Sequence, residues 1–336
     1  MVIRSVFLIF LTLSLFTACE EPYREADISN IPSQVEVLSL RDTLATTSPT
    51  IQQLYQTFGT FWRDYTEDIL RIGPADNPET LNKIAQFLTD PTISELEGAI
   101  ADVHGNQLSN YGQELDDAFR RYHFFFPESK PPQVIFMNSG FNFGIYPIDG
   151  QLGIGLDFYL GGSHPMTETL DPNLFPLFLK KKMEPEYLVG DAMRGWMLVN
   201  HQEAHYDDTN LLSTAMYWGK TLYLMDLLFP ESADHLKINF TPEDIAWCQA
   251  NERNLWLSFS NQDVLYERRK FEVNRWIEDG PFTRAADLPQ EAPSRMGQWI
   301  CWQVVRDYMA RNKDVTPEML LAETNYLKML NSYRPD

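Results

Sequence analysis

Residues 133–159 read QVIFMNSGFNFGIYPIDGQLGIGLDFY and form a β-rich stretch in an otherwise helical sequence. Three runs inside this stretch have the composition of strands, namely 133–137, 141–146 and 152–159. Asp149-Gly150 separates the last two runs, and Asp-Gly between apolar runs is a strong signal for a β-hairpin. We therefore expect a small sheet of about three strands, or slightly more, set inside a helical chain.

Helical periodicity surrounds the expected sheet. Apolar residues recur at helical spacing over 51–69, 78–88, 92–103, 115–126, 174–183, 185–200, 210–229, 242–259, 263–277, 293–312 and 317–330. Three of these segments have capping residues at their start, namely Thr241 before Pro242, Thr316 before Pro317, and Ser294. The pattern predicts a single α+β domain that is mostly helical.

The amino terminus has the features of an exported lipoprotein. Arg4 precedes an apolar run over 6–16, and Cys19 directly follows the small residues Thr17-Ala18. Such a run is too short to span a bilayer stably, so we expect residues 1–18 to be a signal peptide. Cys19 would then carry the lipid, with acyl chains such as palmitate. An uncleaved anchor, or an ordinary signal in which Cys19 is incidental, is the alternative.

The segment after Cys19 is polar, contains Pro22 and Pro32, and has no sustained period. We therefore expect 19–48 to be a tether and 49–336 to be the folded domain. No later apolar run reaches membrane length, so this domain should lie in the aqueous phase of a bacterial envelope. Glu20-Glu21 after the cysteine favours the outer membrane over the inner membrane.

Composition limits the partners. Of the 336 residues, 44% are hydrophobic and 13% aromatic, which is sufficient for a large core. The formal net charge of -20 argues against a nucleic acid or an anionic lipid surface as a partner, because both require a basic footprint.

Cys248 and Cys301 could pair in an oxidising envelope, but each lies beside a tryptophan in a helical pattern, and we favour two buried thiols.

His201 and His205 stand four residues apart, which is a spacing that metal-binding histidines use on a helix. Zinc peptidases use His-Glu-x-x-His, in which the acid directly follows the first histidine. Here Glu203 stands two residues after His201, so on a helix it would face away from a shared metal. We expect surface histidines near a helix end, with an active zinc peptidase as the alternative.

Four segments spread along the chain are distinctive, namely GIGLDFYLG at 153–161, PEYLV at 185–189, MYWGKTLY at 216–223 and PSRMGQWI at 293–300. Through these segments the chain as a whole resembles the gliding-motility lipoprotein GldB family of Bacteroidetes. The family in turn is similar, more distantly, to gluzincin-type zinc peptidases. The resemblance therefore implies a degenerate zinc-peptidase-like domain.

By position, the first zinc helix of such a peptidase would fall within 188–198, which contains no histidine, and Trp218 stands near the place of the third ligand. The resemblance thus implies a scaffold without catalytic residues, metal or cofactor, whose pocket could hold something without cutting it. The candidate lining residues are Asp191, Arg194, Trp218, Arg295 and Trp299. Ion-paired arginines and core tryptophans are the simpler explanation of the same residues.

The function implied by the resemblance is that of a non-enzymatic envelope lipoprotein required for gliding motility. Its partners would be other gliding-motility envelope proteins, including those of the type IX secretion apparatus, and its contact with the membrane would be the lipid anchor. An active zinc peptidase and a glycan- or peptide-binding lipoprotein of a nutrient-uptake system are the alternatives.

Overall fold

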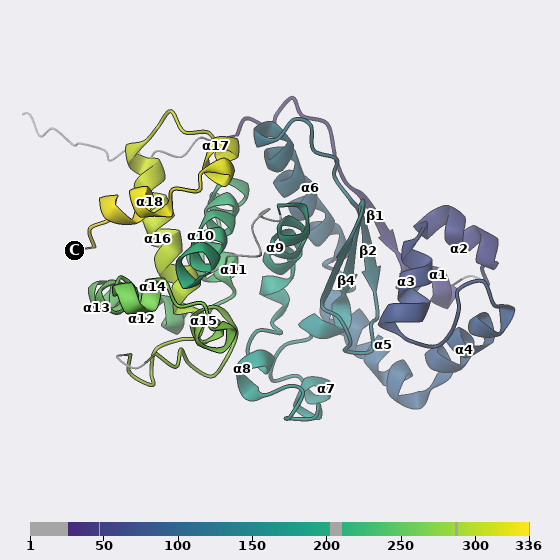
Figure 1. The fold of residues 1–336 in the computed structure, drawn as a ribbon. Coiled ribbons are helices and arrows are strands. Elements are labelled where there is room, and N and C mark those ends of the chain that lie inside the picture. Colours follow the sequence, from purple (N-terminus) through teal and green to yellow (C-terminus); the bar gives the residue numbers. More distant parts are fainter. Residues whose placement is uncertain (1–25, 47, 202–209, 286–287, 336) are drawn as a thin grey trace, which may run out of the picture.

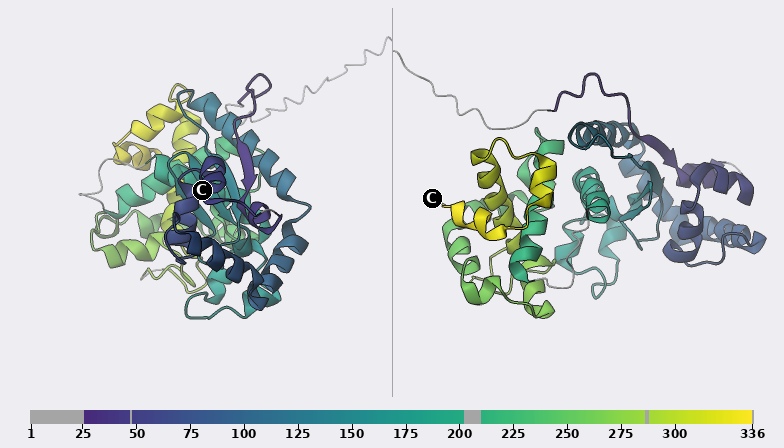
Figure 2. Two further views of the ribbon diagram at one scale, coloured as in Figure 1. Left: turned by 90° about the vertical axis from the view of Figure 1, so that its right-hand side faces the viewer. Right: turned by 45° about the horizontal axis from the view of Figure 1, so that its top comes forward.

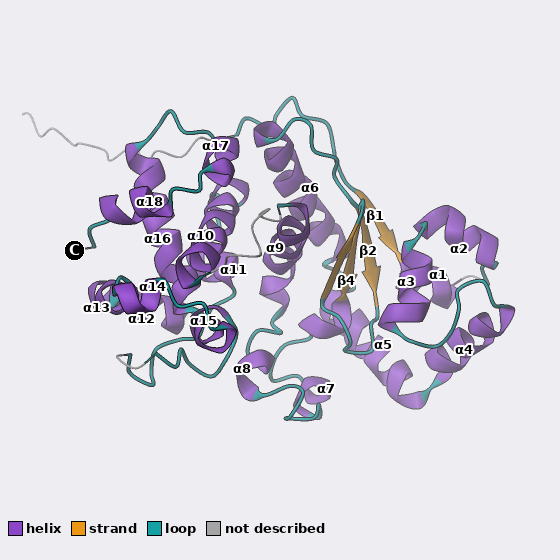
Figure 3. Cartoon of the chain, in the orientation of Figure 1, coloured by secondary structure: helices purple, strands orange, loops and turns teal. Residues whose placement is uncertain are grey.

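The computed structural model describes residues 26–46, 48–201, 210–285 and 288–335. Its centre is a four-stranded mixed sheet with the order β1-β2-β4-β3, and helices cover both faces of this sheet (Figures 1 and 3). The strands are β1 (Glu36–Ser39), β2 (Gln133–Met137), β3 (Ile145–Ile148) and β4 (Gln151–Gly155). The small sheet in a mostly helical α+β domain is therefore confirmed.

The predicted hairpin is present. β3 and β4 pair antiparallel on either side of Asp149-Gly150, and Gly150 adopts a φ of 69° that suits glycine in a tight turn. The strand expected over 141–146 lies slightly later, because Gly140 and Phe141 both have positive φ and form a loop after β2. The last expected strand is shorter, since Leu156–Tyr159 form a 3₁₀ turn, η2.

The tether boundary is wrong, because the folded part begins before residue 49. β1 pairs in parallel with β2, from Glu36 with Gln133 to Ser39 with Phe136. Leu40, the first residue of helix α1 (Leu40–Thr46), is fully buried. A four-residue strand whose partner lies about a hundred residues later leaves no local periodicity, which is why the sequence pattern did not reveal it.

The segment before β1 is fastened to α6 (Leu108–Phe125). Asp116 Oδ1 accepts hydrogen bonds from the hydroxyl of Ser33 at 2.9 Å and from the backbone N–H groups of Gln34 and Val35 at 2.7 and 3.1 Å. One turn later, Arg120 donates from Nε to the carbonyl oxygen of Ile31 at 2.8 Å. Polar residues that suggested a free linker are therefore ordered by two charged side chains of one helix.

The remaining elements are helical. Before β2 they are α2 (Ile51–Phe58), α3 (Phe61–Asp64), the π-helical turn η1 (Tyr65–Ile69), α4 (Pro78–Thr89) and α5 (Pro91–His104). Between the sheet and residue 201 they are α7 (Pro165–Glu168), α8 (Leu177–Lys180), η3 (Pro185–Tyr187) and α9 (Leu188–Asn200). The later ones are α10 (Leu211–Leu228), α11 (Asp234–Ile238), α12 (Pro242–Ala250), α13 (Glu252–Phe259), α14 (Gln262–Leu265), α15 (Lys270–Ile277), α16 (Met296–Arg311), α17 (Pro317–Ala322) and α18 (Tyr326–Ser332).

Alternate residues of β2 face the two sides of the sheet and belong to two different cores. Ile135 and Met137 pack with the amino-terminal helices, whereas Val134 and Phe136 pack with α6 and α9. A third core lies among the carboxy-terminal helices around α16. The helix α10 joins this third core to the second, since its buried hydrophobic residues from Leu211 to Leu222 pack in the third core and those from Leu224 to Leu228 pack in the second.

Candidate functional site

The structure brings together three of the five candidate pocket residues and separates the other two. Asp191 and Arg194 lie on α9 and form an i, i+3 ion pair, and Arg295 reaches the same region from the start of α16. Trp299 instead is 2% exposed inside the carboxy-terminal core, and Trp218 is partly buried against the same core. The simpler explanation, core packing, therefore describes these two tryptophans.

Asp191 is the acceptor at the α9 side of the site. It accepts hydrogen bonds from the hydroxyl of Tyr159 at 3.1 Å and from Nδ2 of Asn239 at 2.8 Å, besides its pair with Arg194. Asn239 ends α11 in the left-handed conformation, with a φ of 54°, which asparagine tolerates better than most residues. The helix end thereby turns the amide of Asn239 toward the carboxylate.

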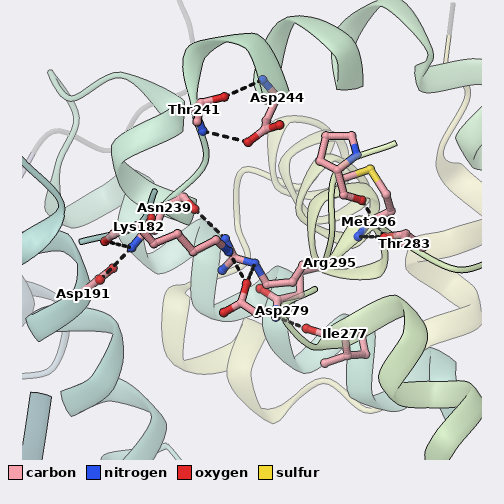
Figure 4. A network of polar contacts seen from close by, with 12 residues as sticks. Lys182, Asp191, Asn239, Thr241, Asp244, Ile277, Asp279, Thr283, Arg295 and Met296 are labelled. Atoms are coloured by element: carbon pink, nitrogen blue, oxygen red, sulfur yellow. Dashed lines mark hydrogen bonds and ion pairs between the residues drawn. The ribbon is translucent and has the colours of Figure 1, made fainter. Parts of the chain in front are cut away.

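Arg295 occupies the opposite side. Its Nη2 donates to the backbone oxygen of Asn239 at 2.6 Å, and its Nε lies 2.9 Å from Oδ1 of Asp279. The guanidinium also stacks 4.8 Å from the ring centroid of Phe240. Figure 4 shows that Lys182 reaches the same carboxylate of Asp279, with which it forms an ion pair.

We call this group the Lys182 cluster. Its members come from the loop after α8, from α9, from the end of α11, from the loop after α15 and from the start of α16, and they are Lys182, Asp191, Arg194, Asn239, Asp279 and Arg295. The cluster joins elements that follow the sheet directly to elements of the carboxy-terminal half. Residues about a hundred positions apart therefore meet at one seam.

The cluster contains one more cation than anion, because Lys182, Arg194 and Arg295 face two carboxylates. Burial, together with the nearby Arg295, lowers the pKa of Lys182 to about 7. Burial alone would raise the pKa of Asp279, but Arg295 and Lys182 outweigh it and lower that pKa to about 2. The surplus positive charge thus falls mainly on the lysine, which is the cation that can lose its proton most easily.

A second group of charges lies next to this seam, and we call Asp226, Asp234, Lys237, Trp302 and Arg306 the Asp226 cluster. Asp226 is 1% exposed and accepts hydrogen bonds from Lys237 at 3.0 Å, from the indole of Trp302 at 2.9 Å and from Arg306 at 2.7 and 2.6 Å. Arg306 also makes two 2.7 Å hydrogen bonds to Asp234. Two cations here match two carboxylates.

The Asp226 cluster borders a cavity of about 520 Å³. The cavity is lined by Tyr223, Asp226, Pro230, Ser232, Ala233, Asp234, Lys237, Arg306, Asp307 and Ala310. The two clusters are linked through Arg194, whose Nη1 lies 3.4 Å from the backbone oxygen of Lys237. None of the residues that line this cavity was among the candidates from the sequence, and neither were Lys182, Asn239 and Asp279, because no spacing in the chain relates these residues.

His201 caps the end of α9 and faces the protein interior. Its Nε2 lies within hydrogen-bond distance of the hydroxyl of Tyr122, and its ring packs 5.3 Å from that of Phe126. Burial lowers the pKa of His201. Glu203 and His205, the other members of the expected motif, lie outside the described residues. His201 therefore lies near a helix end as expected, but it is half-buried and hydrogen-bonded instead of freely exposed.

Two further observations concern ligands and pairing. Within the described ranges, no three or more His, Cys, Asp or Glu side chains are grouped so that they could hold a metal ion. Cys248 and Cys301 are both unpaired and buried, as the sequence favoured. Burial raises the pKa of both thiols.

Comparison with known proteins gives one match. A family model described as gliding motility protein GldB, which is a lipoprotein family, matches residues 21–335. No curated protein and no solved structure matches the chain. Over the part of the chain that the structure describes, none of the helices combines the length and the apolar character needed to cross a bilayer. Because the match extends over nearly all of its length, the chain belongs to the GldB family of gliding-motility lipoproteins.

Proposed function

We propose that this protein is a non-catalytic lipoprotein of the cell envelope that is required for gliding motility. It is held to the membrane, by preference the outer membrane, through a lipid on Cys19 after removal of residues 1–18. It acts through contacts with other gliding-motility envelope proteins, including those of the type IX secretion apparatus. The match of residues 21–335 to the family carries this proposal, because it begins two residues after the cysteine and continues past the end of α18.

The helix at the expected zinc position supports a non-catalytic role. α9 spans Leu188–Asn200 and offers no histidine before its cap, His201. The polar residues of α9 that point to the seam, Asp191 and Arg194, pair with each other. These two side chains are therefore engaged in contacts within the protein and do not form the open coordination site that a catalytic zinc ion needs.

Disruption of the gene tests the motility role. Cells that lack the protein should stop gliding, and the intact chain should restore movement. A Cys19→Ala variant should fail to restore it and should leave the membrane fraction, whereas a Cys248→Ala variant, which removes a buried thiol, should remain membrane-bound. Normal gliding in the disrupted strain would refute the proposal, and labelling with a radioactive fatty acid that persists in Cys19→Ala would refute the anchor.

Metal analysis of the purified mature chain separates this proposal from a zinc peptidase. We expect less than a tenth of an equivalent of zinc, with the same content in His201→Ala and His205→Ala. His164→Ala, remote from α9 in sequence, is the matched control. Stoichiometric zinc that is lost in both variants and retained in the control would establish the peptidase alternative.

A further inference from the structure

The cavity beside the Asp226 cluster has the size of a ligand site. Its volume of about 520 Å³ lies within the range of about 300 to 1,000 Å³ that is usual for small-molecule sites. Its walls come from the end of α10, from the loop 230–233, from α11 and from one face of α16. Figures 1 and 2 show α10 and α16 side by side in the carboxy-terminal half of the chain. The residues of the Lys182 cluster are not among its lining residues.

The walls of the cavity are fixed by the Asp226 cluster. The carboxylate of Asp226 on α10 accepts hydrogen bonds from Lys237 on α11 and from Arg306 on α16, so one side chain connects three walls. Asp226 and Lys237 are almost fully buried, and both line the cavity. A cavity whose shape is fixed in this way loses little conformational entropy when a ligand fills it.

Arg306 presents one flat face of its guanidinium group to the cavity. Its five N–H groups are matched by five hydrogen bonds, to Asp226, Asp234 and Gln303, so the edges of the group are occupied. One face stacks on the indole of Trp302, with 3.8 Å between the guanidinium carbon and the ring centroid. Trp302 is fully buried and is not a lining residue, whereas Arg306 lines the cavity and its side chain is 27% exposed. The opposite face of the guanidinium is therefore the part that a ligand would contact.

An aromatic ring fits this face. The guanidinium of arginine stacks on aromatic rings, as that of Arg306 already does on Trp302. Pro230, Ala233 and Ala310 supply apolar surface elsewhere in the walls. A ring in the cavity would complete a stack in which the guanidinium lies between the ring and the indole.

The charges around the cavity favour a neutral ligand. The two carboxylates and two cations of the Asp226 cluster match each other, and the third carboxylate of the lining, that of Asp307, pairs with Arg311 at 2.8 Å. Carboxylates and cations are therefore equal in number. An anion would lie near these carboxylates and a cation would lie on the guanidinium of Arg306, so either would meet a like charge.

The ligand should also carry a hydrogen-bond donor. The Oδ1 atom of Asp307 lies next to Arg311, but its Oδ2 atom is buried and has no hydrogen-bond partner among the described residues. A buried acceptor without a partner costs free energy, and a donor on the ligand would remove that cost. A phenol supplies an aromatic ring and a donor in one neutral group.

We propose that this cavity binds a phenol ring, which stacks on the open face of Arg306 and donates its hydroxyl hydrogen to Asp307. Two sources carry this chemistry, namely a tyrosine side chain of another polypeptide and a free phenolic compound. The site is additional to the proposed role in gliding, and its absence would leave that role unchanged.

Titration of the purified mature chain, followed by ligand-observed NMR, provides the test. N-acetyl-tyrosinamide should bind with a Kd about tenfold lower than that of N-acetyl-phenylalaninamide, because one hydrogen bond to a charged group is gained. Ala310→Phe fills the cavity and should abolish binding of the tyrosine compound, whereas Ala246→Phe, at an exposed position of α12, should leave its Kd unchanged. If Ala310→Phe lowers the unfolding midpoint, Ser232→Phe blocks the cavity from the opposite loop.

The role of Asp307 as acceptor is tested by a second pair of variants. Asp307→Ala should abolish the preference for the tyrosine compound over the phenylalanine compound. Arg311→Met removes the cation that pairs with Asp307 but keeps the acceptor, so it should preserve the preference. Loss of the preference in neither variant would overturn the proposed hydrogen bond.

Three outcomes in the titrations would overturn the site as a whole. They are equal Kd values for the tyrosine and phenylalanine compounds, tighter binding of N-acetyl-argininamide than of the tyrosine compound, and binding of the tyrosine compound that survives both cavity-filling variants. With the site upheld, p-cresol separates the two sources, since it has the ring without peptide groups. Tighter binding of p-cresol than of N-acetyl-tyrosinamide would indicate a free phenolic compound, and weaker binding would indicate a tyrosine of a polypeptide.

Discussion

The two charged clusters that lie side by side at the seam differ in their balance. In the Asp226 cluster, two carboxylates face two cations, and Asp226 alone accepts four hydrogen bonds. In the Lys182 cluster, three cations share two carboxylates, and the pKa of Lys182 falls to about 7. A buried cluster with equal numbers of cations and carboxylates holds its ion pairs at neutral pH. A cluster with one extra cation contains a proton that it can release near neutral pH.

The largest effect should come from breaking the balanced cluster. Asp226→Asn leaves Lys237, which is 4% exposed, and Arg306 without their shared carboxylate. Removing one partner of a buried ion pair costs about 3 to 5 kcal/mol, and we expect that loss in the free energy of unfolding by urea. Asp102→Asn, on the exposed side of α5, is the control and should change it by less than about 0.5 kcal/mol. A loss below 1 kcal/mol in Asp226→Asn would show that the two clusters do not differ in this way.

The same change in the Lys182 cluster should have a smaller effect. Asp279→Asn removes the carboxylate shared by Lys182 and Arg295, but the side chain of Asp279 is 37% exposed and water screens the cations that remain. We expect a loss of about 1 to 2 kcal/mol in the same urea experiment. A loss equal to that of Asp226→Asn would mean that the seam is as buried at Asp279 as at Asp226.

A third effect should depend on pH and does not involve the loss of an acidic partner. The pKa of Lys182 is about 7 in the folded chain and about 10.4 when unfolded, so between these values the unfolded chain binds more protons at this site. The contribution of Lys182 to stability therefore rises with pH from about 7 to about 10. Even one unit of pKa shift corresponds to about 1.4 kcal/mol.

Comparison of the wild type with Lys182→Met isolates this contribution. The difference in free energy of unfolding should move in favour of the wild type as the pH increases from 7 to 10. Lys181→Met, which removes an exposed neighbouring lysine, should give a difference that does not vary with pH. If the difference in free energy of unfolding between the wild type and Lys182→Met did not vary with pH either, Lys182 would not be the group that releases the proton.

Local signals in the sequence predicted local structure well. Thr241 and Thr316 cap α12 and α17 as expected, each accepting a hydrogen bond from a backbone N–H three residues later. Ser294 does not cap α16, because Arg295 takes the left-handed conformation before the helix begins at Met296. The helix expected over 242–259 is interrupted at Asn251, where the backbone leaves helical geometry.

The site could be predicted only where it was local or carried by the family resemblance. Asp191 and Arg194 stand three residues apart on one helix, so their pairing follows from helical geometry. Lys182 and Asp279 meet across 97 residues, and neither has a neighbour in the sequence that indicates the other. The sequence left Trp299 open between a pocket and the core, because a tryptophan on a helix that is buried on most sides looks the same in sequence as one that lines a pocket.

The fastening of residues 31–35 on α6 has a mechanical consequence. Tension applied to the chain ahead of Ala26 would reach the hydrogen bonds to Asp116 and Arg120 before it reached the β1–β2 ladder. The parallel β1–β2 ladder would be loaded next. The hydrogen bonds to Asp116 and Arg120 therefore stand in series before the sheet and would be the first to bear a pull from the amino-terminal side.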